Sequence, residues 1–197
     1  MKILVLVISK KWSVIQRNVY YMKNLVKKTL DLARLNSPNT SFDFELLSLH
    51  DLVNHMIEKN ASFFKENNVI FLNHIPKDMM VYADEIQLFE VLDNLMNNSV
   101  KYKKDDSVNI IFSAKKHNGE ITISVTDDGI GMNKNQIENV FDEFYKADQS
   151  RHDFDSSGLG LPICKRIIEK HGGMIWIDSN GLGKGSPDYF TLPAYLT

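Results

Sequence analysis

Two segments with alternating apolar residues, 108–112 and 121–125, are joined through Asn118-Gly119. This dipeptide favours the tight turn of a β-hairpin, because both residues adopt positive φ at low cost. A hairpin buries one face of its sheet, so other elements of the chain must cover that face. This hairpin therefore constrains the fold more than any other feature of the sequence.

Helical patterns supply the covering elements. Residues 84–101 have apolar side chains at helical spacing behind the N-cap residue Asp84, and residues 161–170 are again amphipathic. Ser48 with Asp51 indicates the start of a helix that runs to about residue 67. Short apolar runs predict further strands at residues 42–46, 69–72, 79–82, 174–177 and 189–192. We therefore expect an α+β sandwich, with one sheet and helices on a single face.

The N-terminal part has a different pattern. In residues 13–36 apolar side chains recur at steps of three and four, and Pro38 ends this predicted helix. The stripe consists of Ile15, Val19, Met22, Val26 and Ala33, broadened by Leu25 and Leu32. The remainder of the chain or a second copy must cover this stripe, and we favour a two-helix dimerisation stalk. We expect a helical segment at 1–40 and a second domain at 41–197.

Charge and cysteine content exclude several classes of function. Lys and Arg number 23 against 25 Asp and Glu, so no basic field exists to hold a nucleic-acid backbone. The single cysteine, Cys164, forms neither an internal disulfide nor a multi-thiolate metal site, which indicates a reducing, cytoplasmic compartment. The most apolar stretch, 3–8, is far shorter than the roughly 20 residues of a membrane span. We interpret it as the end of a buried or dimer-facing helix.

One motif on the predicted 84–101 helix indicates metal chemistry. Asn94, Asn98 and Lys101 are spaced four and three residues apart, so they share one helical face beside the apolar stripe. A buried asparagine is costly unless it is hydrogen-bonded, so this face is either the wall of a polar cavity or a solvated surface. An amide oxygen is a hard ligand that suits Mg²⁺, which also retains waters and substrate phosphates.

Two glycine-containing motifs follow. In the first, an apolar strand ends at Asp127, and Gly129 and Gly131 come after it; the carboxylate could accept a hydrogen bond from an exocyclic amine such as that of adenine. Alone, this motif is also typical of a simple turn. In the second, residues 157–161 (Ser-Gly-Leu-Gly-Leu) open a helix. Free N–H groups at a helix N-terminus bind phosphate oxygens, although an ordinary glycine-rich loop fits as well.

The order of these motifs, with 141–145 (Phe-Asp-Glu-Phe-Tyr) before the last, resembles the catalytic ATP-binding domain of sensor histidine kinases. That family has its N, G1, F and G2 boxes in this order. A glycine group at 181–185 lies near the family's terminal hairpin, and residues 31–35 resemble the end of its second dimerisation and phosphotransfer helix. The resemblance implies a Bergerat-type α/β sandwich with a mixed, mostly antiparallel sheet, a long dimerisation helix before it, and ATP with Mg²⁺ as cofactors.

The resemblance also implies roles at the phosphate end of the nucleotide. Asn98 would coordinate Mg²⁺, and Asn94 would support the phosphates as a catalytic residue. Lys101, the second catalytic residue, and Lys146 would meet phosphate charge. The lid over the phosphates would include Gly158, Leu159 and Gly160, with residues 148–157 as its mobile part.

At the base end, the resemblance implies four more contacts. Asp127 would bind the adenine amine, and Tyr102 would pack at the nucleotide. Gly129 and Gly131 would make room for the base. Because phosphoryl transfer depends mainly on positioning and charge neutralisation, this set of residues suits it.

One difference from related nucleotide folds favours a kinase. Heat-shock chaperones, gyrase and mismatch-repair enzymes have a water-activating glutamate four residues before the metal-binding asparagine. That position is Asn94 here, and an amide cannot act as a general base. Glu90, two turns before Asn98, is a poor substitute.

Other positions depart from the family. The kinases phosphorylate a histidine that is followed by an acid on the first dimerisation helix, and no such pair precedes residue 13. The pairs His50-Asp51 and His152-Asp153 fit loop or cap positions, and residues 1–12 are expected to be a remnant of that first helix. Asp128 replaces the usual asparagine, and Ser156 replaces the first glycine of the G2 box.

We therefore predict the ATP-binding portion of a sensor histidine kinase that transfers the γ-phosphoryl group to a histidine for relay to a response regulator. The expected partners are a receiver domain and a second copy of the chain. For the acceptor, either the protein is a truncated or split kinase, or it acts on a histidine-bearing helix of another chain. Two alternatives remain: a degenerate nucleotide-binding or dimerisation module, and a serine kinase of the anti-sigma-factor type.

Overall fold

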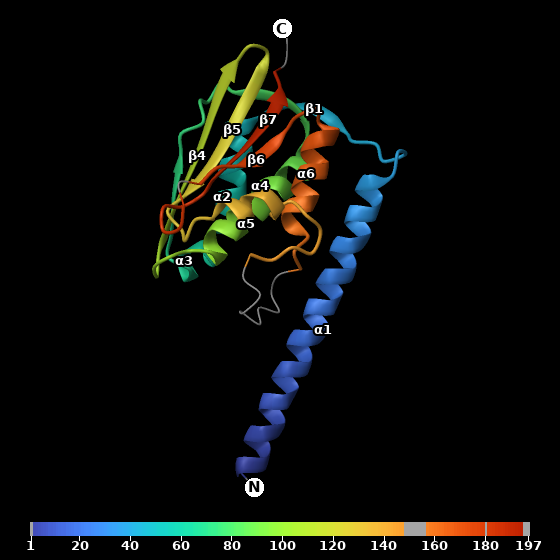
Figure 1. The fold of residues 1–197 in the computed structure, drawn as a ribbon, viewed down its shortest axis with the longest axis vertical. Helices are drawn as coiled ribbons and strands as arrows, with labels where there is room; N and C mark the ends of the chain where they lie inside the picture. Colours follow the sequence, from blue (N-terminus) through green and yellow to red (C-terminus); the bar gives the residue numbers. More distant parts are fainter. Residues whose placement is uncertain (1, 148–156, 180, 195–197) are drawn as a thin grey trace.

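The computed structural model describes residues 2–147, 157–179 and 181–194. Figure 1 shows a long N-terminal helix that extends well beyond a layered body of sheet and helices. The elements in chain order are α1 (Lys2–Asn36), β1 (Phe44–Ser48), α2 (Leu49–Lys59), α3 (Ala61–Glu66), β2 (Val69–Asn73), β3 (Met80–Asp84), α4 (Glu85–Lys101), β4 (Val108–His117), β5 (Glu120–Asp127), α5 (Lys134–Asn139), α6 (Gly160–Lys170), β6 (Ile175–Ile177) and β7 (Pro187–Pro193).

The main sheet has five strands in the order β2-β4-β5-β7-β6. Only the β2–β4 pair is parallel, and the other pairs are antiparallel. Asn118 (φ 48°) and Gly119 (φ 80°) form the β4–β5 turn, as their sequence predicts. The expected α+β sandwich with a mixed, mostly antiparallel sheet is thus confirmed.

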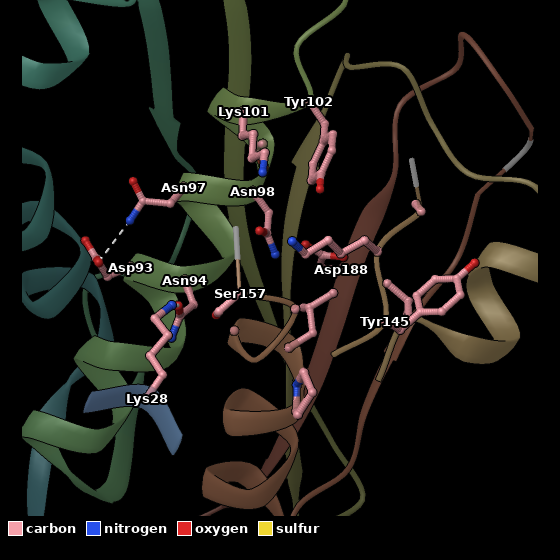
Figure 2. A pocket seen from close by; sticks show the side chains of 18 of the residues that line it. Lys28, Asp93, Asn94, Asn97, Asn98, Lys101, Tyr102, Tyr145, Ser157 and Asp188 are labelled. Carbon is pink, nitrogen blue, oxygen red and sulfur yellow. Dashed lines mark hydrogen bonds between the residues drawn. The ribbon is translucent and has the colours of Figure 1, made fainter. Parts of the chain in front are cut away.

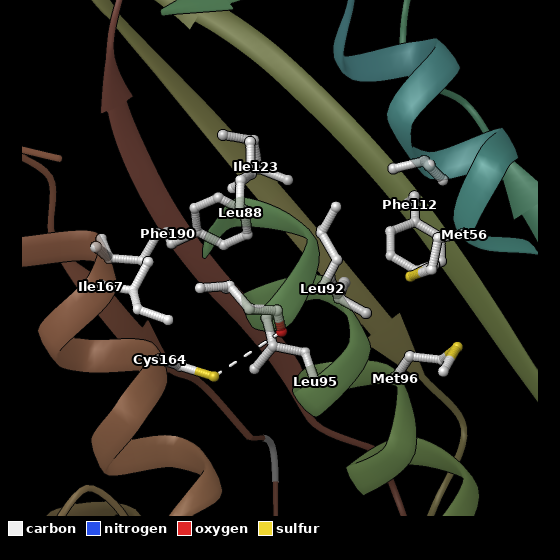
Figure 3. Packing of buried hydrophobic residues seen from close by; sticks show 14 of the residues in the cluster. Met56, Leu88, Leu92, Leu95, Met96, Phe112, Ile123, Cys164, Ile167 and Phe190 are labelled. Atoms are coloured by element: carbon white, nitrogen blue, oxygen red, sulfur yellow. Dashed lines mark hydrogen bonds between the residues drawn. The ribbon is translucent and has the colours of Figure 1, made fainter. Parts of the chain in front are cut away.

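The hydrophobic core lies between this sheet and its helices. Alternate residues of β4 and β5, including Phe112 and Ile123, are fully buried, whereas their neighbours are at least partly exposed. Leu88, Leu92 and Leu95 of α4 pack in the same cluster (Figure 3). Every second residue of the strands and the residues at helical spacing on α4 each form one apolar face, and these faces pack against each other.

Three details differ from the sequence-based expectation. β1 and β3 pair with each other in a separate two-stranded sheet, and the side chain of Asp84 at the end of β3 accepts a hydrogen bond from the Asp43 N–H (2.9 Å). The helix expected over 48–67 divides at Asn60, whose side-chain amide donates to the Met56 carbonyl and competes with the helical backbone. The short helix α5, capped by Asn133, was not predicted.

Helix α1 is continuous from Lys2, so the expectation that residues 1–12 are a remnant of a separate helix is wrong for the described residues. No proline or glycine interrupts this segment. Leu32 and Leu35 are buried where α1 packs beside α6, and Leu25 is partly buried. The other stripe residues from Ile15 to Val26 are each more than half exposed. No helix in the described ranges is both long and apolar enough to cross a membrane.

His171, directly after α6, contacts both the end of β3 and the segment at the start of β1. Its Nε2 accepts a hydrogen bond from the Asp84 N–H (3.1 Å), and its Nδ1 donates to the Ile167 carbonyl (2.8 Å). Its ring lies 5.0 Å from those of Phe42 and Phe44. Burial lowers the pKa of His171 below 6.5, so the folded protein keeps this imidazole neutral.

We expect the contribution of His171 to the free energy of unfolding to fall as the pH drops below about 6.5, because the unfolded state then binds a proton that folded His171 excludes. The loss should level off below the lowered pKa of the folded state. Urea unfolding at several pH values measures this slope. His171→Gln should remove the His171 contribution from the slope measured for wild type, and the exposed His74→Gln should not; equal slopes in all three proteins would contradict the account.

Candidate functional site

A pocket of about 920 Å³ opens among α1, α4, α6 and the ends of β5 and β7 (Figure 2). Most of the residues singled out in the sequence line it. They are Asn94, Asn98, Lys101, Tyr102, Asp127, Gly131, Lys146, Gly158 and Gly160. Segments from α1 at one end of the chain to β7 near the other therefore meet at one cavity.

Helix α4 forms one wall. The Asp84 side chain accepts a hydrogen bond from the Gln87 N–H and caps the helix, while the apolar face packs on the sheet. Asn94 and Asn98 are half-buried and lie one turn apart along the pocket side (Figure 2). Asn97, between them, points aside and donates to Asp93 (2.9 Å). The polar-cavity interpretation of the asparagine face thus holds.

Asn94 is held in place from two sides. Its Nδ2 donates to the Glu90 carbonyl (3.0 Å), and its Oδ1 accepts from Lys28 Nζ on α1 (3.2 Å). By contrast, no described residue hydrogen-bonds to the Asn98 amide. The Asn98 oxygen is therefore available to a ligand or a metal ion.

Asp127 forms part of the floor, at the end of β5. Its Oδ1 accepts hydrogen bonds from the N–H groups of Gly129 (2.8 Å) and Ser186 (3.4 Å), and its Oδ2 accepts one from Ser99 Oγ (3.1 Å). Burial raises the pKa of Asp127, and these hydrogen bonds act against that rise. The carboxyl group is thus held in a fixed orientation in a poorly solvated corner.

The two glycines after Asp127 allow other backbone segments to approach closely. A Cβ on Gly129 would lie 2.6 Å from the Tyr102 carbonyl oxygen, and Gly129 is not among the lining residues, so it does not make room for a base. Gly131 does line the pocket, with φ of +66°, and it packs against the loop around Gly181. Only Gly131 fits the expected role.

The N-terminus of α6 forms the opposite wall. Gly158 and Gly160 line the pocket, and a Cβ on Gly160 would lie 3.2 Å from Asn94 Oδ1. Leu159 is fully buried in the hydrophobic core and does not face the pocket, which corrects its expected lid role. The predicted mobile segment, apart from Ser157, and with it His152 and Ser156, lies outside the described residues.

Charges of both signs surround the cavity. Lys28, Lys101 and Lys146 line it, with Lys101 Nζ 5.2 Å from the Tyr102 ring centre and Lys146 Nζ 5.9 Å from that of Tyr21. Burial raises the pKa of Glu90, and the nearby Asp31 adds to that rise. Burial also raises the pKa of Asp93. The lysines could neutralise a polyanion within this partly desolvated cavity.

Sequence reasoning missed two sets of lining residues. The first comes from α1 and includes Lys28 and Tyr21. The second is Ser99, Ser186 and Asp188. Of these three, only Asp188 could have been noticed in the sequence, because an acid there interrupts the alternating apolar residues of β7. Asp188 is 4% exposed, and its pKa is raised well above the usual range by burial and by the neighbouring Asp127.

The structure also shows the surroundings of the other residues that the sequence analysis singled out. Asp128 is exposed and accepts a hydrogen bond from the Asn109 N–H (2.9 Å), which ties the β5 end to β4. His50 lies in the first turn of α2, behind the cap residue Ser48, and its Nδ1 is hydrogen-bonded to the Ile75 carbonyl (2.8 Å), so it is not itself the cap. Cys164 is fully buried, and burial raises the pKa of its thiol. Among the described residues no cluster of His, Cys, Asp and Glu could hold a metal ion.

Comparison with known proteins agrees with this architecture. Residues 83–196 match the family described as histidine kinase-, DNA gyrase B- and HSP90-like ATPases. The chain belongs to this family. The matched range includes α4, Asp127, α6 and the strands between them, and so contains the pocket apart from its α1 side.

Relatives within the family are sensor kinases. The chain is 35% identical over 184 residues to the sensor histidine kinase WalK of Bacillus subtilis (strain 168), a match that covers 91% of this chain and 30% of that protein. The chain thus spans about a third of the length of this relative.

Two solved histidine kinases share the fold. Full-length ShkA in complex with AMPPNP has a TM-score of 0.75 at 23% identity, over 88% of this chain and 36% of that one. ThkA in complex with the response regulator TrrA has a TM-score of 0.74 at 23% identity, over 92% and 50%.

Proposed function

We propose that the chain binds ATP with Mg²⁺ in this pocket and provides the catalytic portion of a sensor histidine kinase. The observation that carries the proposal is the fixed Asp127 carboxyl on the pocket floor, with the available Asn98 amide on the α4 wall. Asp127 would accept a hydrogen bond from the adenine amine, and Tyr102 would pack at the nucleotide.

The phosphate end suits a polyanion. Lys101 and Lys146 would meet phosphate charge, and Gly158 and Gly160 at the start of α6 line the same space. Mg²⁺ supplies charge neutralisation at the phosphates, and Asn98 would hold it through its amide oxygen. This donor set fits a metal ion that takes its other ligands from phosphates and water.

The site favours transfer over hydrolysis. Asn94 stands where the related hydrolases have a general base, and its amide is already engaged by Lys28 and the Glu90 carbonyl. An amide in this position orients groups but takes no proton. The γ-phosphoryl group would therefore pass to a protein acceptor.

The acceptor is proposed to be a histidine outside α1, because α1 contains none. A separate histidine-bearing helix would supply it, and an aspartate of a response regulator would receive the group next. The exposed stripe from Ile15 to Val26 would pair with a second copy, since such a row of apolar side chains needs a partner. The proposed compartment is the cytoplasm.

Transfer of labelled γ-phosphate to an added helical hairpin that bears a phosphoacceptor histidine tests the proposal. We expect an acid-labile product, and none when that histidine is replaced by glutamine. An acid-stable product would instead indicate a serine kinase. Absence of any product from a folded protein that binds ATP would overturn the kinase function and leave a nucleotide-binding module.

A further inference from the structure

Asp188 is the most unusual polar group in the described part of the chain. It is 96% buried and lines the pocket, and its Oδ1 has no hydrogen-bond partner among the described residues. In the β5–β7 ladder Asp188 pairs with Val125, and Asp127 lies two residues after Val125 on β5. Two carboxyl groups thus lie close together in the same corner of the pocket.

Such a group is costly in a folded protein. A buried polar atom without a partner loses its hydration and gains nothing in return, at a cost of about 1–3 kcal/mol. Phe190 and Leu192, the next residues on the same face of β7, are fully buried and apolar. A valine at position 188 would continue this apolar face, so the acid is explained better by a ligand than by folding.

The surroundings determine which carboxyl keeps a proton. Asp127 accepts hydrogen bonds from two backbone N–H groups and Ser99, which stabilise its ionised form. No described residue donates a hydrogen bond to Asp188 Oδ1, and from α6 the buried Cys164 thiol is close enough to Asp188 to interact with it electrostatically. Burial and the charge of Asp127 hold the pKa of Asp188 well above its usual range. Of the two carboxyl groups, Asp188 is therefore the one whose surroundings favour the protonated form.

We propose that Asp188 is a second base-contacting residue, which gives the bound purine a hydrogen-bond donor that the Asp127 carboxylate cannot supply. The pair then presents an acceptor and a donor side by side. This pattern complements an aminopurine edge, in which an exocyclic amine lies next to a ring nitrogen that accepts. The inference rests on the proposed nucleotide site and adds a determinant of base specificity to it.

Two variants at this position test the inference. Asp188→Val removes the donor, and Asp188→Asn keeps a neutral group of the same shape that can still donate. We expect Asp188→Val to weaken ATP binding roughly tenfold, the effect of leaving one buried hydrogen bond unmade. Asp188→Asn should stay close to wild type. Inorganic tripolyphosphate, which has no base, should bind wild type and Asp188→Val equally.

Thermal unfolding separates this role from a structural one. Asp188→Val should unfold at the same temperature as wild type or higher, because it removes an unsatisfied buried polar group. Unchanged ATP affinity in Asp188→Val, with a wild type that binds, would overturn this inference alone. Equal losses for ATP and tripolyphosphate would also overturn it. A folded wild type that does not bind ATP would overturn both this inference and the proposed function.

Discussion

Replacing Asp127 with alanine is expected to weaken ATP binding by about 100-fold. The carboxylate would be lost as an acceptor for the adenine amine, and a hydrogen bond to a charged group contributes about 1.5–3 kcal/mol. Its hydrogen bonds to Gly129, Ser186 and Ser99 would be lost as well, so the loop after β5 would be less well positioned. Calorimetric titration with a non-hydrolysable ATP analogue measures the change.

The neighbouring residue provides a matched control. Asp128 has the same side chain, but it is exposed and bonded to Asn109 outside the pocket lining. Asp128→Ala should leave ATP affinity within about twofold of wild type. Equal losses in the two variants, or a wild-type affinity in Asp127→Ala, would show that Asp127 does not contact the base.

Replacing Asn98 with alanine is expected to reduce phosphoryl transfer by a factor on the order of 100. Mg²⁺ contributes several kcal/mol of charge stabilisation in such reactions, and the variant removes its proposed protein ligand. Binding of the ATP analogue without Mg²⁺ should be unchanged, and the gain in affinity on adding Mg²⁺ should disappear. The histidine-hairpin transfer assay and calorimetry with and without Mg²⁺ measure the two effects.

Asn97→Ala is the control for this prediction. It removes the same amide one residue earlier on α4, where the side chain is turned aside toward Asp93. We expect less than about a threefold effect on transfer and an intact Mg²⁺ dependence. If Asn98→Ala retains the Mg²⁺ gain, the metal is held elsewhere and the assignment of Asn98 is wrong.

Local signals in the sequence predict much of this fold and site. Asn118-Gly119 predicts the central hairpin because a tight two-residue turn needs positive φ at both residues, and both have it in the structure. Asn94, Asn98 and Lys101 share a helical face by spacing alone, and the helix does place them on one pocket wall. These features depend on neighbours within one element, so sequence periodicity is enough to find them.

Features that depend on distant segments were not predictable. Contact between Lys28 and Asn94 requires that α1 pack beside α6, which no local pattern encodes. Leu159 lies between two pocket-lining glycines, yet its side chain turns into the core as α6 begins. Gly129 shows the same limit, because the reason for a glycine there is the Tyr102 carbonyl, 27 positions earlier in the chain.

The central claim is that this pocket binds ATP together with Mg²⁺. Calorimetric titration of the wild-type chain with a non-hydrolysable ATP analogue, with and without Mg²⁺, tests it most directly. We predict one site per chain, with affinity that increases when Mg²⁺ is added. A folded protein that shows no binding at millimolar nucleotide under either condition would contradict the account.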